Sequence, residues 1–164
     1  MKNCASQEDL EASKSRYFDL YDLAPVSYLT LSEQGLILEA NLSAATMLGV
    51  VRNDLLKKSI SQNIFPDDQD DYYLLNKRHI ETGKLQTLDI RLVRADGSSF
   101  WVHLKATPAH NGEYGITFTD ISKRKQAETA LVELHANLKQ RVEEESDPFR
   151  GLCDIGIFWI EYPI

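Results

Sequence analysis

Cysteine and long apolar runs are scarce in this sequence. Its two cysteines, Cys4 and Cys153, lie near opposite ends without a CxxC pair, so a disulfide framework or a cysteine-based zinc site is poorly supported. Residues 1–11 contain no apolar run that would form the core of a signal peptide, and the stretch from Ile155 to Ile160 is far too short to span a bilayer. We therefore expect a cytoplasmic protein with reduced thiols and no membrane partner.

Positive charge is also in short supply. The chain has 18 lysines and arginines against 25 aspartates and glutamates, which gives a formal net charge of -7. Because a phosphate backbone attracts cationic surfaces, and because no basic stripe interleaved with aromatics is present, we expect no nucleic-acid partner. The length of 164 residues is enough for one domain with extensions.

Recognisable catalytic and metal-binding motifs are missing as well. The sequence has no glycine-rich phosphate loop, no HExxH pair and no motif that would hold a nucleophile beside a base. The histidines are scattered over a predicted helix, strand, turn and second helix; they are His79, His103, His110 and His135. We expect a protein that is not an enzyme, and we assign no catalytic residue.

A cluster of acidic residues precedes one predicted helix. The residues are Asp67, Asp68, Asp70 and Asp71. They lack the loop spacing and the glycine of a calcium site, whereas carboxylates are favourable at the positive end of a helix dipole. We interpret the cluster as a solvated helix start and predict no metal site.

Hydrophobic periodicity predicts a helix at each end of the central region. Leu10, Tyr17 and Tyr21 recur at roughly helical intervals before Pro25, which predicts a helix over residues 1–24. This helix is either a solvated leader with one apolar face or a segment that pairs with a partner chain. After Asp120 a second helix carries apolar residues spaced as in a short coiled coil; they are Ala127, Leu131, Leu134, Leu138 and Val142. Its seam covers little more than two heptads and needs a neighbour.

Between these helices the sequence predicts strands at both ends and helices in the middle. Asn41 is a good N-cap for a short helix that Gly49 would end, a second short helix is plausible over 54–57, and a longer one runs from Pro66 to Thr82. Alternation and glycine turns predict an opening hairpin and a later three-stranded meander; the strands are 26–31, 36–40, 88–92, 100–106 and 114–118. This order indicates an α+β domain.

Four local motifs follow one another along the chain. They are Tyr28-Leu29-Thr30-Leu31 with Gly35 to Asn41, Leu48-Gly49-Val50, Arg94 to Ser98 with Phe100-Trp101-Val102, and Asp120 to Glu128. In this order the motifs resemble the PAS family of sensor domains. The resemblance covers roughly Tyr17 to Glu128, and Ser122 stands where the family usually has threonine, so the hydroxyl is retained.

The resemblance implies a PAS-like five-stranded antiparallel sheet with short helices on one face, enclosing a small cavity and flanked by N- and C-terminal helices. The expected organisation is an N-terminal helix over 1–24, a PAS sensor domain over 25–122, a C-terminal signalling helix over 123–145 and a tail of undecided role over 146–164. The tail is either the start of a truncated downstream module or a terminus without a structural role.

The last motif gives the candidate site for signal relay. Asp120 can cap the C-terminal helix, and Arg124 lies four residues on, within reach of an ion pair. We assign relay to Asp120, Ile121, Ser122 and Arg124. We assign a seam between the two chains of a parallel homodimer to Leu131, Leu134 and Leu138, to which the N-terminal helix would add Leu10, Tyr17 and Tyr21.

The resemblance also disfavours two coloured cofactors. Flavin-binding relatives carry a reactive cysteine where this chain has Ile60, and heme-binding relatives take their axial histidine near Tyr72, one to two turns before His79. His135 lacks the acid and proline that follow a phosphoacceptor histidine in kinases. With flavin and heme disfavoured, two possibilities are left for the interior of the domain: it binds a small metabolite, or it is empty and well packed.

The resemblance implies signal perception and relay. We expect a sensor module, of the kind found in two-component systems, that perceives a small ligand or partner and relays it through its C-terminal helix to an output protein or domain of the histidine-kinase or cyclase class. Two alternatives stay open. One is a ligand-free dimerisation or docking module, and the other is a remnant of a longer sensor histidine kinase or cyclase without its output domain.

Overall fold

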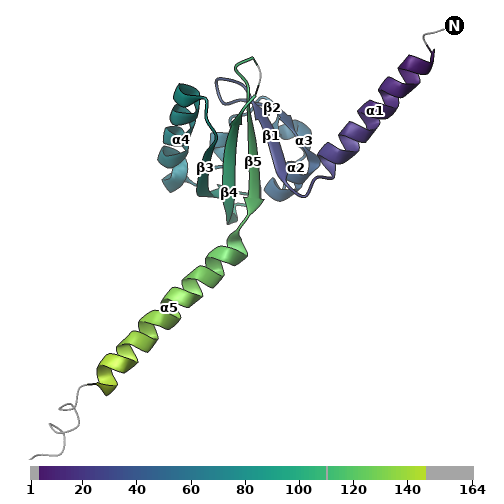
Figure 1. Cartoon of the computed structure of the whole chain (residues 1–164). Helices are drawn as coiled ribbons and strands as arrows, with labels where there is room; N and C mark the ends of the chain where they lie inside the picture. Colours follow the sequence, from purple (N-terminus) through teal and green to yellow (C-terminus); the bar gives the residue numbers. More distant parts are fainter. Residues whose placement is uncertain (1–3, 110, 147–164) are drawn as a thin grey trace, which may run out of the picture. The chain divides into compact units, whose positions relative to one another are not determined.

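The computed structural model describes residues 4–109 and 111–146, so residues 147–164 of the expected tail lie outside the described residues. The part up to Ser122 and the part from Lys123 are separate compact units. In chain order the elements are α1 (Cys4–Asp22), β1 (Ser27–Leu31), β2 (Ile37–Ala40), α2 (Leu42–Leu48), α3 (Arg52–Leu55), the 3-10 turns η1 (Ile60–Asn63) and η2 (Pro66–Asp68), α4 (Gln69–Thr82), β3 (Gln86–Val93), β4 (Ser99–Pro108), β5 (Tyr114–Asp120) and α5 (Ser122–Glu145) (Figure 1).

The five strands form one antiparallel sheet in the order β2-β1-β5-β4-β3. The predicted opening hairpin is the β1–β2 pair, and the predicted meander is β3–β4–β5. The two parts join through β1 and β5, where Leu29 lies opposite Ile116. The fold class expected from the sequence is therefore confirmed.

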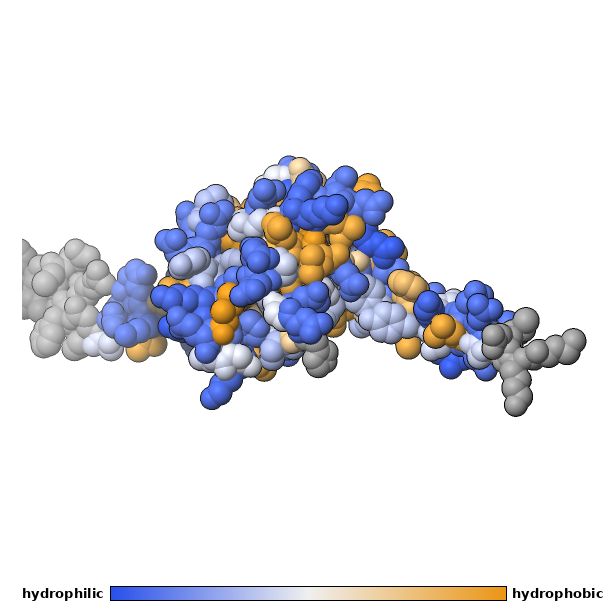
Figure 2. Space-filling view, turned by 90° about the horizontal axis from the view of Figure 1, so that it is seen from above, coloured by the Kyte–Doolittle hydropathy of each residue, from blue (hydrophilic) through white to orange (hydrophobic). Residues whose placement is uncertain are grey.

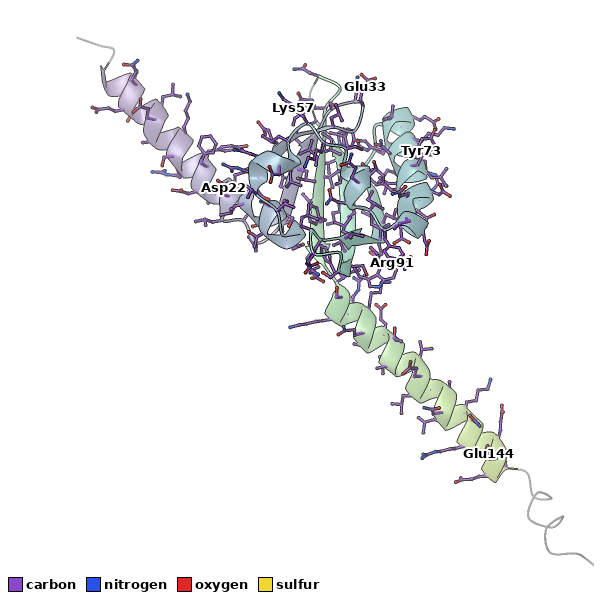
Figure 3. The ribbon with its side chains drawn as sticks, turned by 180° about the vertical axis from the view of Figure 1, so that it is seen from behind. Asp22, Glu33, Lys57, Tyr73, Arg91 and Glu144 are labelled. Atoms are coloured by element: carbon purple, nitrogen blue, oxygen red, sulfur yellow. The ribbon has the colours of Figure 1, made fainter. Side chains whose placement is uncertain are left out.

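Alternation along the strands sends one set of side chains into the core. In β4, for example, Val102 and Leu104 are fully buried while Lys105 is exposed. Helices α2, α3 and α4 lie over this face (Figures 1 and 3), and α4 contributes Tyr72 and Leu75 to the same core. Each fully buried aliphatic side chain contributes about 1.5–3 kcal/mol, so this layer stabilises the domain.

The predicted helix ends are close to those observed. Asn41 caps α2 by accepting a hydrogen bond from the Ala44 amide, and Gly49 ends that helix with φ 70°. Gly83 ends α4 with φ 60°, a left-handed conformation that costs glycine nothing. The residues after Pro66 differ from the prediction, because Pro66–Asp68 forms a 3-10 turn before α4 begins. The short helix predicted over 54–57 lies two residues earlier, as α3.

Candidate functional site

The three residues that join β5 to α5 are held on the neighbouring strand β4. The Ile121 amide donates to the Trp101 carbonyl at 2.9 Å, and the Trp101 amide donates to Ser122 Oγ at 3.1 Å. The Ser122 amide donates to Asp120 Oδ1 at 2.8 Å, so Asp120 satisfies a backbone donor at the start of α5. We call Asp120–Ser122 the exit segment.

Asp120 makes an ionic contact with Arg94, a residue that sequence spacing did not suggest, and the pair of Asp120 with Arg124 stays a prediction. Arg94 Nη2 lies 3.6 Å from Asp120 Oδ2, whereas Arg124 Nε lies 3.4 Å from Glu128. Arg94 Nε also donates to the Met47 carbonyl at 3.1 Å. Arg94 therefore links the last turn of α2 to the residue that caps α5.

The predicted seam of α5 is open to solvent in the single chain. Leu131, Leu134 and Leu138 are 58%, 53% and 49% exposed, and no residue of α5 is buried. Apolar side chains are exposed on α1 as well, among them Leu10 and Tyr17. Figure 2, in which the molecule is seen from above, shows a patch of apolar surface on the folded domain and apolar side chains along α1. Both helices thus present apolar side chains that stay exposed among the residues the structure describes.

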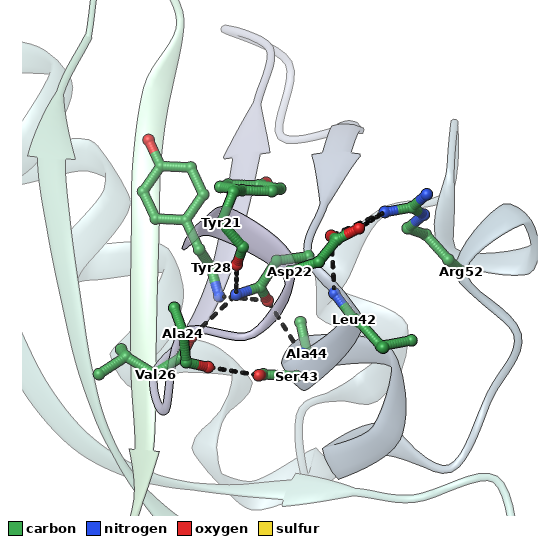
Figure 4. Close-up of polar contacts among 10 residues, drawn as sticks. Tyr21, Asp22, Ala24, Val26, Tyr28, Leu42, Ser43, Ala44 and Arg52 are labelled. Carbon is green, nitrogen blue, oxygen red and sulfur yellow. Dashed lines mark hydrogen bonds and ion pairs between the residues drawn. The ribbon is translucent and has the colours of Figure 1, made fainter. Parts of the chain in front are cut away.

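The end of α1 is anchored by Asn41, whose role extends beyond the predicted cap (Figure 4). The side chain of Asn41 is fully buried; its Oδ1 also accepts from the Tyr28 amide, and its Nδ2 donates to the carbonyls of Tyr21 and Val26 at 3.0 and 2.9 Å. All of its hydrogen-bonding capacity is thus used to hold α1, β1 and α2 together.

Aromatic and ionic contacts add to this N-terminal anchor. Tyr21 stacks on Tyr17 and meets Tyr28 edge to face, with ring centroids 6.0 and 5.5 Å apart. Arg52 pairs with Asp22 at 2.8 Å (Figure 4). Burial raises the pKa of Tyr21, whose hydroxyl is buried without a partner. An apolar groove of about 390 Å³ runs along this junction between α1 and the sheet.

Three buried polar atoms without partners lie between α4 and β5. They are the hydroxyls of Tyr72 and Tyr114 and Oδ1 of Asn76. The three side chains lie near one another: contacts of Tyr114 with Tyr72 and Asn76 contribute to the pKa of the tyrosines, although none of these contacts has the geometry of a full hydrogen bond. Burial is the largest cause and raises the pKa of both tyrosines, so both hydroxyls keep their protons at neutral pH. We call these three residues the polar trio.

A groove of about 280 Å³ reaches Tyr114, one member of the polar trio, from the surface. Tyr114 and the buried His79 line it, and Glu33 and Glu113 lie at its walls. The ring of His79 packs 5.5 Å from that of Tyr114, and its Nδ1 lies 2.9 Å from the Lys84 carbonyl. His79 is therefore held by the backbone at the end of α4.

The two residues that the sequence comparison places at the cofactor positions of flavin and heme relatives are both buried. Ile60 is buried in η1, and Tyr72 is buried in α4. Among residues 4–109 and 111–146, no three His, Cys, Asp or Glu side chains are grouped so as to hold a metal ion. Over the same residues, no helix is both long enough and apolar enough to cross a membrane.

One member of the acidic cluster differs from the prediction. Asp67, Asp70 and Asp71 are exposed, but Asp68 is buried and contacts Arg91 Nη2 at 2.7 Å. The hydrogen bond from Arg91 holds the pKa of Asp68 below its usual range. Asp68 is thus a structural ion-pair partner, and sequence spacing gave no signal for it because the two residues are 23 positions apart.

Comparison with known proteins gives a consistent family and fold. A family model for the PAS domain matches residues 25–123. The PAS domain of an HTR-like protein from Haloarcula marismortui is similar, with 20% identity and a TM-score of 0.62 over 71% of this chain and 98% of that one. A domain of a sensory box sensor histidine kinase/response regulator from Geobacter sulfurreducens shares 17% identity, with a TM-score of 0.59 over 68% and 96%. The PAS domain of a LuxR-family transcriptional regulator from Burkholderia thailandensis, in complex with ethanol, shares 23% identity, with a TM-score of 0.55 over 65% and 97%.

Proposed function

This chain belongs to the PAS domain family, and we propose that it is a cytoplasmic sensor module that binds a small polar ligand at the polar trio and relays binding through the exit segment to α5. The observation that carries the proposal is the set of three buried, unpartnered polar atoms of Tyr72, Asn76 and Tyr114. The module has no catalytic role in this proposal, in keeping with the usual role of its family.

A bound molecule that forms hydrogen bonds with the polar trio would lower the free energy of the folded domain. A buried polar group without a hydrogen bond costs about 1–3 kcal/mol, and native proteins rarely leave several such groups together. A molecule with a hydroxyl or amide group supplies both a donor and an acceptor, which matches two tyrosine hydroxyls and one amide oxygen. An ordered water molecule would also satisfy these groups, and a titration with a small alcohol distinguishes a ligand from water.

Relay requires that the guest affect α5, and the exit segment supports such a connection. Tyr114 and Asp120 are the first and last residues of β5, so one strand joins the polar trio to the cap of α5. A ligand that favours one of two arrangements of the domain shifts the population in proportion to its differential affinity. The C-terminal helix would report that shift to a protein or domain of the histidine-kinase or cyclase class.

A titration with ethanol tests perception directly, since one structural neighbour is a complex with this small alcohol. We expect ethanol to shift the backbone amide resonances of Tyr72, Asn76 and Tyr114, followed by those of Ile121 and Ser122. The double variant Tyr72→Phe/Tyr114→Phe should lose the response. Tyr73→Phe is the matched control, because Tyr73 is the next residue on α4 and is 67% exposed (Figure 3).

The same titration can also contradict the proposal of a ligand at the polar trio. If ethanol shifts only surface resonances, or shifts the trio equally in the double variant, the trio holds water and the ligand proposal is wrong. Native mass spectrometry of the purified protein gives a second readout, because a retained metabolite adds a fixed mass that the double variant should lose.

A second candidate function is a ligand-free dimerisation module. The exposed apolar residues of α1 and α5 favour it, because both helices leave apolar surface for a partner. A homodimer through the seam Leu131, Leu134 and Leu138 is compatible with either function. A packed interior that excludes ethanol, combined with a stable dimer, would favour this second candidate.

A further inference from the structure

Arg91 binds the segment that leads into α4 with both its backbone and its side chain. Its carbonyl accepts from the Phe65 amide at 2.9 Å, and its amide donates to Asp68 Oδ2 at 2.7 Å. Its guanidinium reaches both carboxylate oxygens of Asp68, at 3.0 and 2.7 Å. A forked contact of this kind fixes orientation as well as distance, so Arg91 and Asp68 move as one unit.

The same guanidinium rests on two aromatic rings. It lies 4.1 Å from the centroid of Phe65 and 5.5 Å from that of Trp101. Arg91 and Trp101 are cross-strand partners in β3 and β4. Trp101 in turn holds the exit segment, since its carbonyl binds the Ile121 amide and its amide binds Ser122. A contiguous series of contacts therefore runs from the start of α4 to the start of α5.

We infer that Arg91 is a positioning residue that couples α4 to the exit segment through Asp68 and Trp101. The inference rests on the proposed function, because α4 carries Tyr72 and Asn76 of the polar trio. Tyr72 lies four residues after Asp68, one helical turn away, so a displacement of Tyr72 moves the carboxylate that Arg91 grips. Arg91 touches no ligand and acts only by transmitting the position of α4.

A continuous series of contacts does not by itself show that α4 and the exit segment are energetically coupled, so the test measures how a change in α4 affects the exit segment. Tyr72→Phe removes one unpartnered buried hydroxyl, which should slow amide hydrogen exchange along α4. In the otherwise unaltered protein we expect the same substitution to slow exchange at Ile121, Ser122 and residues 126–129 by about fivefold or more, the lower end of typical coupling between sites.

The response is then measured in two variants that interrupt the series. With Arg91→Met, Tyr72→Phe should still slow exchange in α4 but should leave the exit segment and α5 unchanged. Trp101→Leu should have the same effect while keeping the Asp68–Arg91 pair, which covers the case in which Arg91→Met does not fold. Arg52→Met is the matched control, because Arg52 also pairs with an aspartate, Asp22, and should leave the response intact.

Two other results of this experiment would contradict the role of Arg91. If the response of α5 persists in both Arg91→Met and Trp101→Leu, the coupling runs elsewhere and Arg91 is not the positioning residue, although the proposed relay stands. If Tyr72→Phe slows exchange in α4 but never affects α5 in the unaltered background, α4 does not communicate with the exit helix, and both this inference and the proposed relay are wrong.

Discussion

Single residues that look alike in the sequence have different roles according to what surrounds them. Asp67 and Asp68 are adjacent, yet the side chain of the first is 77% exposed and that of the second is 13% exposed. Arg91 approaches both, but makes close hydrogen bonds only with Asp68. The difference arises because Asp68 turns toward the edge of β3, where the backbone amide of Arg91 is available to it.

This environment predicts a pH dependence that belongs to Asp68. Because the folded pKa of Asp68 is depressed, the pair stabilises the fold above the unfolded value of about 3.9 and loses this contribution as pH falls through the folded pKa. We expect Asp68→Asn to lower the free energy of unfolding by about 1.5–3 kcal/mol near neutral pH. The loss should shrink when urea unfolding is repeated below about pH 4.

The neighbouring acid supplies the control for that measurement. Asp67→Asn should change stability little at either pH, because exposed ion pairs contribute about 0–1 kcal/mol. An Asp68→Asn variant whose loss is the same at both pH values would show that the carboxylate charge is not what Arg91 recognises.

At the scale of elements, α5 depends on contacts at its first turn. Asp120 accepts from the Ser122 amide and pairs with Arg94. Asp120→Ala removes a cap and a partly exposed ion pair, which together contribute about 1–2 kcal/mol. We expect a cooperative melt close to that of the parent protein, with faster amide exchange from Lys123 to Leu134 and little change in β3 and β4.

A second substitution at Asp120 separates the two contacts. Asp120→Asn keeps an oxygen for the Ser122 amide but removes the charge that Arg94 meets. If the cap is what matters, Asp120→Asn should exchange like the parent protein. Unchanged exchange in Asp120→Ala would make Asp120 an ordinary surface acid, and loosening of the whole domain would make it a residue of the fold.

The seam of α5 predicts assembly. Leu131 and Leu138 are exposed on the same helical stripe, so a second copy of the chain would bury them. We expect the purified protein to sediment as a dimer and Leu131→Asp/Leu138→Asp to sediment as a folded monomer. Val132→Asp is the control, because Val132 is even more exposed than these leucines but lies off the stripe. A parent protein that stays monomeric at high concentration would contradict the seam.

At the scale of the whole molecule, a few side chains in the interior of the PAS fold decide which cofactor the domain binds. The resemblance to flavin-binding and heme-binding PAS domains leads us to expect Ile60 and Tyr72 at the positions where those relatives carry their ligands. We therefore expect the purified protein to be colourless in its ultraviolet–visible spectrum, including after incubation with heme or flavin and removal of excess. A stoichiometric Soret band, or a flavin spectrum that bleaches in blue light, would contradict this expectation.

The sequence by itself determined the features that depend on neighbours along the chain. Strand alternation, the Asn41 cap and the glycine ends of α2 and α4 are local, since backbone propensity and side-chain period fix them within a few residues. The spacing of Leu131, Leu134 and Leu138 along α5 is local too. For this reason the five strands and the flanking helices could be predicted, with differences of only a few residues at the ends of elements, whereas the single five-stranded sheet was implied by the resemblance to the PAS family.

Only the tertiary structure decided which distant residues meet. Arg94 follows β3 and lies 3.6 Å from Asp120 at the end of β5, a contact between residues that are far apart in the sequence. Asp68 contacts Arg91 of the edge strand β3, and Tyr72 and Asn76 of α4 meet Tyr114 of β5 in the polar trio. Such contacts depend on how elements pack, and residue spacing along one chain carries no information about that packing.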